Sequence, residues 1–227
     1  FLNKSLQVPD VLSFIWQYKE IYVDESYKFL SASPNPIIID CGTNIGMSCL
    51  YFKSIYPTAS ITGFEADASI AALCKENLLH NGITDVSIIP KAVWINDAGV
   101  CFEEDGADGG KINNEQSKAA TVPSVRLKDV LQQYEKIDML KMDIEGAEYS
   151  VLEDCATVLH RIDHLFIEFH SYPNQPQHLA ELMKIMADAG FRLYIKEVNN
   201  RKSPLAHQGK EKMMDVQLNI FAYQPTK

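Results

Sequence analysis

Apolar residues recur with two different periodicities along this chain, and each periodicity predicts one kind of secondary structure. Residues 37–39 (Ile-Ile-Ile) are apolar at every position and β-branched, which is typical of a strand buried on both faces. In residues 47–55 the apolar side chains recur every three or four positions, which is typical of an amphipathic helix. On this basis, strands are predicted at residues 37–39, 60–64, 86–89, 137–142, 164–169, 191–198 and 216–223, and helices at residues 11–18, 47–55, 70–78, 127–134, 147–152 and 179–187.

The order of these elements predicts the fold class. From residue 37 onward strands and helices alternate, which favours a parallel, doubly wound sheet with helices on both faces. No helix is predicted between the strands at 191–198 and 216–223, so the last strand is expected to be antiparallel. The sequence therefore predicts an α/β, three-layer, Rossmann-like fold whose seven-stranded sheet is mostly parallel.

Two segments fall outside this alternation. Residues 1–36 are expected to form an N-terminal helical leader or partial lid, because the Pro-Asn-Pro run at 34–36 separates them from the first strand. Residues 97–121 are polar and rich in turn residues, which predicts a flap inserted into the main domain at 37–227. Because the chain begins with Phe1 rather than Met, we expect it to be a piece of a longer protein.

Charge and cysteine content argue against several classes of protein. Lys and Arg number 21 against 30 Asp and Glu, and the net charge of -9 argues against nonspecific binding to nucleic acid or to an anionic membrane. No apolar stretch reaches the roughly 18 residues that a membrane span needs, so membrane insertion is not expected. The five cysteines form no C-x-x-C pair and most lie in apolar segments. We therefore expect buried free thiols and a cytoplasmic protein.

Glycines and acids follow the first two strands, at the edge where α/β sheets bind ligands. Residues 40–46 read Asp-Cys-Gly-Thr-Asn-Ile-Gly, and their glycines let the backbone approach a ligand. A dinucleotide-binding loop needs glycine where Asn44 stands, so an NAD-dependent oxidoreductase is the weaker alternative. Glu65 ends the second strand and is placed to accept the hydroxyls of a ribose. With Asp40, this pattern indicates a cationic nucleoside without a diphosphate, which S-adenosylmethionine fits.

Acids and one histidine follow the fourth and fifth strands. Asp143, Glu145 and Glu148 lie within six residues at the start of a helix, where carboxylates are stabilised by the helix dipole. That stabilisation explains Glu148 as well as a functional role does, but it does not explain Asp143, which is expected at the strand end facing the cleft. Glu168 belongs to the fifth strand, and His170 is expected on the loop beyond it.

These blocks resemble the FkbM family of S-adenosylmethionine-dependent methyltransferases over about residues 37–169. The resemblance rests on residues 39–46, 63–65 and 167–170, and most specifically on Leu-Lys-Met-Asp-Ile-Glu-Gly-Ala-Glu at 140–148. It implies a class I methyltransferase fold, O-methylation of polyketides, sugars or glycolipids, and conversion of S-adenosylmethionine to S-adenosylhomocysteine. It also implies that Asp40, Gly42, Asn44, Gly46 and Glu65 contact the cofactor. Further candidates for binding it are Cys41, Thr43, Ala66 and Asp143, the last by orienting the methionine amino group.

The expected chemistry is in-line transfer of a methyl group from the sulfonium to a hydroxyl oxygen. A base must take the hydroxyl proton, and His170 is the first candidate because its ordinary pKa of about 6.5 suits neutral pH. Asp143 is the second candidate, and Glu145 and Glu168 are expected to orient His170 or to bind the acceptor. The spacing matches no recognised metal motif, so no metal ligand is assigned. A divalent metal held by these four residues is an alternative.

The acceptor and the class of partner stay open. The implied partner is a small molecule or a glycan with a hydroxyl group, and a homo-oligomer is left open. A non-catalytic module that senses the cofactor or docks a partner is another alternative, although the intact glycine loop and Glu65 argue against it. Several polar residues of the flap are expected either to bind sugar hydroxyls or to form a solvated loop, namely Asp105, Asp108, Lys111, Asn113 and Asn114.

Overall fold

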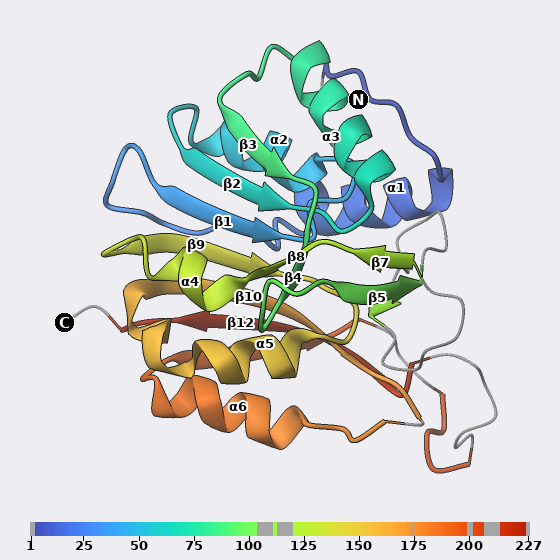
Figure 1. Cartoon of the computed structure of the whole chain (residues 1–227), viewed down its shortest axis with the longest axis vertical. Helices are drawn as coiled ribbons and strands as arrows, with labels where there is room; N and C mark the ends of the chain where they lie inside the picture. Colours follow the sequence, from blue (N-terminus) through green and yellow to red (C-terminus); the bar gives the residue numbers. More distant parts are fainter. Residues whose placement is uncertain are drawn as a thin grey trace.

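A seven-stranded sheet forms the centre of the protein (Figure 1). The computed structural model describes residues 3–103, 111–112, 120–173, 175–198, 202–206 and 214–225. The strands of the sheet are β1 (Ile37–Cys41), β2 (Ser60–Phe64), β3 (Val86–Ile89), β9 (Ile137–Met142), β10 (Ile162–Ser171), β11 (Arg192–Glu197) and β12 (Val216–Tyr223). Their order is β11-β12-β10-β9-β1-β2-β3, and β12 runs antiparallel to both of its neighbours while the other pairs are parallel. The predicted sheet is confirmed.

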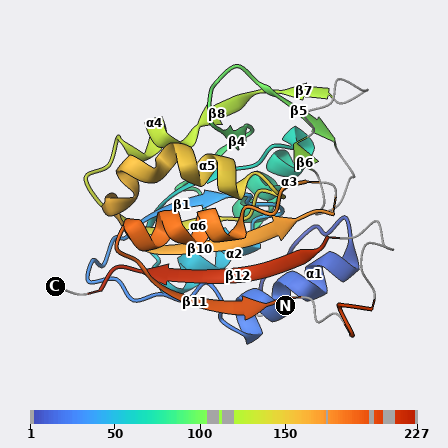
Figure 2. The same cartoon turned by 90° about the horizontal axis from the view of Figure 1, so that it is seen from below.

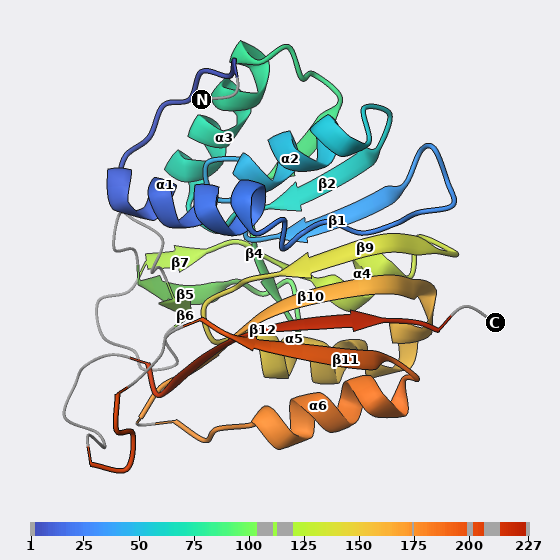
Figure 3. The same ribbon diagram turned by 180° about the vertical axis from the view of Figure 1, so that it is seen from behind.

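Helices cover both faces of this sheet, which confirms the three predicted layers (Figures 1 and 3). One face carries α1 (Val11–Tyr18), a π-helical turn η1 (Lys19–Val23), α2 (Met47–Ile55) and α3 (Ala68–His80). The other carries α4 (Leu127–Leu131), α5 (Glu148–Cys155), the 3₁₀ turn η2 (Ala156–Arg161) and α6 (Leu179–Asp188). Within the described residues, none of these helices has the length and apolar character needed to cross a membrane.

Alternation along β1 separates two hydrophobic cores. Ile38 packs in the cluster that contains Phe52 of α2, whereas Ile39 packs in the cluster that contains Leu152 of α5. Successive side chains of a strand point to opposite faces, so one apolar run supplies both cores. The five cysteines are free thiols and four of them are buried, as the sequence predicts.

The N-terminal segment packs against the α2 and α3 side of the domain. Tyr27 and Phe29 are buried in the same cluster as Phe166, and the rings of Tyr27 and Phe166 are 4.8 Å apart. Further out, the Gln7 backbone N–H donates to the Asn77 side chain at 2.8 Å. In Figure 2, which views the molecule from below, α1 and α5 lie on opposite sides of the sheet. The role of the N-terminal segment as a partial lid stays a prediction.

One small sheet lies in the region of the predicted flap, and a second is formed by the segments that flank it. β5 (Val100–Glu103) pairs antiparallel with β6 (Lys111–Ile112) and β7 (Ala120–Val122), while β4 (Ala92–Trp94) pairs parallel with β8 (Ser124–Arg126). In Figure 1, β5 and β7 lie beyond the ends toward which β1, β2 and β9 point. Of the flap residues named above, Lys111 lies in β6 and the others fall outside the described residues. Sugar binding by this segment stays a prediction.

Several predicted element boundaries differ from the structure by a few residues, and two of them have an identifiable tertiary cause. The fifth strand runs through Ser171, so His170 lies within β10 rather than on a loop. The reason is tertiary, because β12 pairs along the whole end of β10, with His170 opposite Gln217. The helix predicted at 127–134 ends at Leu131, where the Tyr134 carbonyl accepts a hydrogen bond from Arg161 at 2.6 Å instead of continuing a helix.

Candidate active site

A cavity of about 410 Å³ lies at the carboxyl ends of the parallel strands, a size suited to a small ligand. Its walls include the loop after β1, the loop after β9, the N-terminal segment, and residues of β11 and β12. Of the residues predicted from the sequence, eight line it: Gly42, Thr43, Asn44, Glu65, Ala66, Asp143, Glu145 and Glu168. The other four, Asp40, Cys41, Gly46 and His170, are buried behind its wall.

The loop after β1 is fixed against the end of β2. Gly42 and Asn44 have left-handed backbones, with φ of 85° and 46°. The backbone N–H groups of Gly42 and Thr43 both donate to the Phe64 carbonyl, at 2.9 and 3.0 Å. The Asn44 N–H donates to the Glu65 carboxylate at 2.9 Å. These bonds fix the loop at the cavity and join the ends of β1 and β2 there.

Glu65 is an organising carboxylate of this loop as well as a cavity residue. Its second oxygen accepts the Asp67 N–H at 3.0 Å, and burial raises the pKa of Glu65 although both backbone bonds favour its charge. A carboxylate offers about four lone-pair positions, so Glu65 retains capacity for a ligand. Asp67 caps α3 through Ser69 and Ile70, as the sequence predicts.

Two buried polar atoms of the cavity wall have no hydrogen-bond partner among the described residues. They are Thr43 Oγ1 in the loop after β1 and Asn219 Oδ1 in β12. Buried polar atoms are paired in most proteins, so an unpaired one at a cavity wall indicates a place for a ligand or water. The sequence pattern indicates Thr43 only as part of its loop and does not indicate Asn219.

Lys141 is a cavity residue to which the sequence pattern gives no role. Its ammonium group lies 3.6 Å from Asp40 and 3.5 Å from Asp143 and donates to the Gly42 carbonyl. Burial alone would lower the pKa of Lys141, but these carboxylates raise it above its ordinary value. Asp40 is fully buried in β1, where Ser48 donates to it. Asp40 therefore meets the cavity through Lys141 and Ser48, which both line it.

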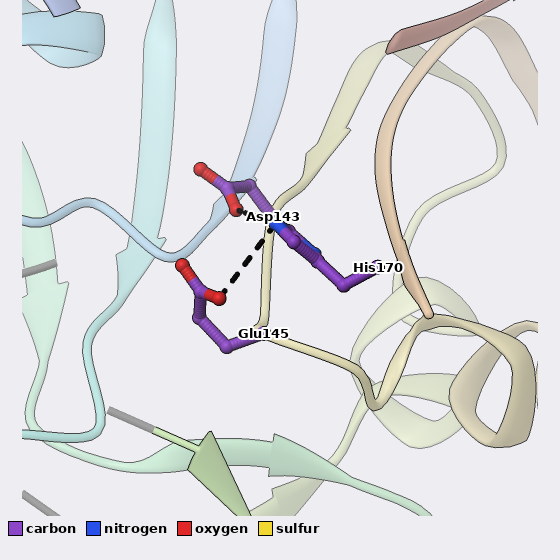
Figure 4. A group of neighbouring side chains, drawn as sticks. All are labelled: Asp143, Glu145 and His170. Atoms are coloured by element: carbon purple, nitrogen blue, oxygen red, sulfur yellow. Dashed lines mark ion pairs between the residues drawn. The ribbon is translucent and has the colours of Figure 1, made fainter. Parts of the chain in front are cut away.

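The structure brings together all four residues predicted to be catalytic, and Figure 4 shows three of them, Asp143, Glu145 and His170. His170 Nε2 lies 3.6 Å from Glu168, 3.7 Å from Glu145 and 4.0 Å from Asp143, and Figure 4 shows the last two carboxylates approaching the imidazole. The other ring nitrogen, Nδ1, lies 2.9 Å from Glu148. The ends of β9 and β10 are adjacent in the sheet, which explains this convergence.

The surroundings of His170 overturn one argument made from the sequence. Burial alone would lower the pKa of His170, but Glu148 and the neighbouring carboxylates raise it well above its ordinary value. An imidazolium has no free lone pair for a proton, so an ordinary pKa is no longer a reason to choose His170 as the base. Burial also raises the pKa of Glu145 to about 8, with the nearby His170 partly offsetting it.

Glu148 does more in the structure than stabilise the dipole of α5. Its side chain is fully buried, accepts the N–H groups of Gly146 and Ile144 at 3.0 and 3.2 Å, and contacts His170. It therefore fixes both the loop after β9 and the imidazole. The sequence places an acid in the first turn of a helix, and nothing in its spacing reveals the buried partner from β10.

Glu20 of η1 is a further acid on the cavity wall that the sequence did not indicate. Its carboxylate accepts a hydrogen bond from Asn219. Burial raises the pKa of Glu20 to about 8, and the charges of Glu168 and Asp143 act in the same direction while Lys141 opposes them. Carboxylates thus outnumber cations around the cavity, which favours a positively charged ligand.

Glu20→Gln is expected to stabilise the folded protein increasingly as pH rises from about 5 to about 8. Folded Glu20 keeps its proton up to about pH 8, whereas the reference value for the group is 4.5. The folded state therefore binds more protons in this window, and the contribution of Glu20 to stability is lost as pH rises. Denaturant unfolding of both proteins across the window measures the difference. A difference that does not grow with pH contradicts the expectation.

The chain resembles known proteins both in sequence and in structure. Residues 40–193 match the family described as Methyltransferase FkbM domain. Methyltransferase sdnD of Sordaria araneosa is 31% identical over 172 residues, which cover 60% of this chain and 66% of that protein. The 2-O-methyltransferase NoeI of Sinorhizobium fredii is 25% identical over 161 residues, 62% of this chain and 65% of that protein. The chain thus covers slightly under two thirds of the length of these relatives.

Solved structures agree in fold at low sequence identity. Methyltransferase FkbM from Methylobacillus flagellatus has a TM-score of 0.57 at 14% identity, covering 91% of this chain and 48% of that one. Precorrin-6y C5,15-methyltransferase from Geobacter metallireducens has a TM-score of 0.52 at 11% identity, covering 98% and 91%. These likenesses confirm the methyltransferase fold. Because the family match runs through the loop after β1 and the cluster after β9, the chain belongs to the FkbM methyltransferase family.

Proposed function

We propose that this protein transfers a methyl group from S-adenosylmethionine to a hydroxyl oxygen of a small molecule or glycan. The observation that carries the proposal is one cavity that joins the Glu65 loop to the carboxylates Asp143, Glu145 and Glu168 in a chain of this family. A relative named as a 2-O-methyltransferase supports a hydroxyl acceptor. The five free thiols favour a reducing, cytoplasmic location, and the net charge favours a partner other than nucleic acid.

The residues around the cavity fit this cofactor. Glu65 would accept the ribose hydroxyls, and the unpaired Thr43 Oγ1 offers a polar contact in the adjoining loop. The excess of carboxylates suits a positive charge. When bound, S-adenosylmethionine supplies a methyl group on a sulfonium, whose C–S electron pair stays on sulfur as S-adenosylhomocysteine forms. The loop bonds to Phe64 and Glu65 hold this side of the cavity ready without rearrangement.

The chain itself must position the acceptor and take its proton. Asp143, Glu145 and Glu168 line the cavity, so they reach an acceptor hydroxyl directly, whereas His170 lies behind them. We therefore assign removal of the hydroxyl proton to one of these carboxylates. His170 has a positioning role, because its Nε2 faces all three of them. Orientation of the oxygen at about 3–3.5 Å from the methyl carbon is worth several orders of magnitude in rate.

Calorimetry with S-adenosylmethionine, followed by mass spectrometry of products from hydroxylated glycosides and small alcohols, tests the proposal. Saturable binding with formation of S-adenosylhomocysteine and a methyl ether supports it. No binding contradicts it. Binding without turnover across a broad set of acceptors favours a module that senses the cofactor instead.

Glu65→Gln is expected to weaken S-adenosylmethionine binding by about 10- to 100-fold, because a hydrogen bond to a charged group is worth about 1.5–3 kcal/mol. The amide nitrogen of Gln cannot accept one of the two backbone N–H groups that Glu65 now holds. The matched control is Glu76→Gln, the same substitution at an exposed position of α3 outside the cavity. Calorimetry measures both variants. Equal affinity in the two would contradict a cofactor role for Glu65.

A further inference from the structure

The group formed by Asp143, Glu145 and His170 has the dimensions of a cation site. One ligand atom from each residue lies within 4.8 Å of the other two. The contacts to His170 Nε2, 3.7 Å from Glu145 and 4.0 Å from Asp143, exceed the hydrogen-bond range of about 2.7–3.2 Å. Ligands of Mg²⁺ lie about 2.1 Å from the ion and those of Ca²⁺ about 2.3–2.6 Å. Two ligands of one ion are therefore at most about 4.2 Å apart for Mg²⁺ and about 4.6–5.2 Å apart for Ca²⁺. Both contacts to His170 Nε2 are shorter than the smaller limit, and all three atoms lie within the larger one.

The outer contacts of His170 are an independent observation that points the same way. Histidines that bind metals usually give one ring nitrogen to the ion and donate the other N–H to a carboxylate. His170 Nδ1 lies 2.9 Å from Glu148, and each of these side chains is 1% exposed. Glu148 is itself held by the N–H of Gly146. With Nδ1 fixed in this way, Nε2 is directed at the carboxylates that line the cavity (Figure 4).

The same carboxylates are open to exchange with solvent. The side chains of Asp143 and Glu145 are 26% and 19% exposed and line the cavity, so an ion could enter and would keep open positions for a substrate oxygen and water. Their charges and that of Glu168 lie close together, and a divalent cation would relieve their repulsion. Lys141 is the neighbouring cation on the Asp143 side, at 3.5 Å.

We propose that Asp143, Glu145 and His170 bind a divalent cation at the cavity wall, and that this ion binds the acceptor hydroxyl. On binding, the ion takes the place of the Nε2 proton of His170, which is released to solvent, while Nδ1–H stays on Glu148. The mixture of carboxylate oxygens and one imidazole favours Mn²⁺ or Mg²⁺ over metals that prefer thiolates. The catalytic part of this inference rests on the proposed function. There the ion lowers the pKa of the hydroxyl, the O–H proton passes to Glu168, and the freed oxygen pair forms the new C–O bond as the C–S pair stays on sulfur.

Titration of the full chain with Mn²⁺, followed by calorimetry and by electron paramagnetic resonance, tests the site without any cofactor. We expect one saturable ion per chain, with binding weakened by at least about tenfold in Glu145→Gln and in Asp143→Asn. The control is Asp129→Asn, an exposed carboxylate of α4 outside the cavity. Circular dichroism checks that each variant is folded. Absence of saturable binding of Mn²⁺, Mg²⁺, Ca²⁺ and Zn²⁺, or unchanged affinity in both site variants, overturns the proposal.

Turnover measured with and without EDTA tests the catalytic part. Loss of methyl transfer in EDTA and its recovery with Mn²⁺ or Mg²⁺ supports the role of the ion. Full turnover in EDTA overturns that role and leaves the proposed function intact. Conversely, Mn²⁺ binding without any binding of S-adenosylmethionine contradicts the proposed function and leaves the metal site intact, so the two failures are distinguishable.

Discussion

Gly42→Ala is expected to abolish detectable binding of S-adenosylmethionine and to destabilise the fold. A Cβ atom at Gly42 would lie 2.0 Å from the backbone oxygen of Asp143, far inside contact distance. That oxygen belongs to the backbone after β9 and cannot rotate away. Relief requires the loops after β1 and β9 to separate, which strains the Asp143 N–H bond to the Cys41 carbonyl, now 3.0 Å. A displacement of about 1 Å in positioning groups costs about 100-fold in rate, so we also expect methyl transfer to fall by at least that factor.

Gly82→Ala is the matched control for this experiment. Gly82 also has a left-handed backbone, with φ of 74° against 85° at Gly42, but a Cβ there meets nothing within 4 Å. Alanine at Gly82 therefore incurs only the backbone penalty of about 1–2 kcal/mol and leaves the cavity intact. Calorimetry and thermal unfolding of both variants measure the comparison. If the two variants behave alike, the close approach of β1 and β9 does not shape the site.

Glu148→Ala is expected to reduce the free energy of unfolding by about 3–5 kcal/mol, because it leaves a buried charged imidazole without its partner. It also removes the acceptor for the Gly146 and Ile144 N–H groups. Both losses act on the cavity wall, since Asp143 and Glu145 lie on the same loop. We therefore expect methyl transfer to fall by about 100-fold or more. Denaturant unfolding and steady-state kinetics measure the two effects.

Glu153→Gln, on the exposed side of the same helix, is the control for Glu148. A surface substitution of this kind changes stability by less than about 0.5 kcal/mol. Glu148→Gln adds a conservative comparison, because the amide keeps the shape and one acceptor oxygen but loses the charge. It should fall between wild type and Glu148→Ala in stability. A Glu148→Ala protein as stable and active as Glu153→Gln would show that Glu148 serves only the helix dipole.

The fold was largely predictable because its elements are local patterns with a fixed geometric meaning. The isoleucines at 37–39 and the apolar spacing of residues 47–55 already separate strand from helix, and their order gives the layers. The ends of strands were harder to predict, because pairing with neighbouring strands decides where each strand ends. Asp40 and His170 were expected near loops, but each lies inside a strand that its neighbours lengthen.

The site was predictable only as far as strand ends determine it. The loop at 42–44 and the acids Glu65, Asp143 and Glu145 follow strands that the pattern located, and the structure places them around one cavity. Glu20 and Asn219 also line this cavity. They come from opposite ends of the chain, and no local sequence pattern indicates that they lie close together. Contacts of this kind depend on how distant segments pack, which a single sequence does not display.

The position of β12 has a consequence for how the protein is made. β12 follows β11 in the chain but lies between β10 and β11 in the sheet, so β10 and β11 cannot close on each other during translation. A nascent chain that has not yet released β12 from the ribosome presents an unpaired β10 edge, which invites association with other chains. Gln217 and Asn219 of β12 also complete the cavity wall. β12 therefore completes the sheet and the cavity wall together, and we expect both to be complete only after the ribosome has released it.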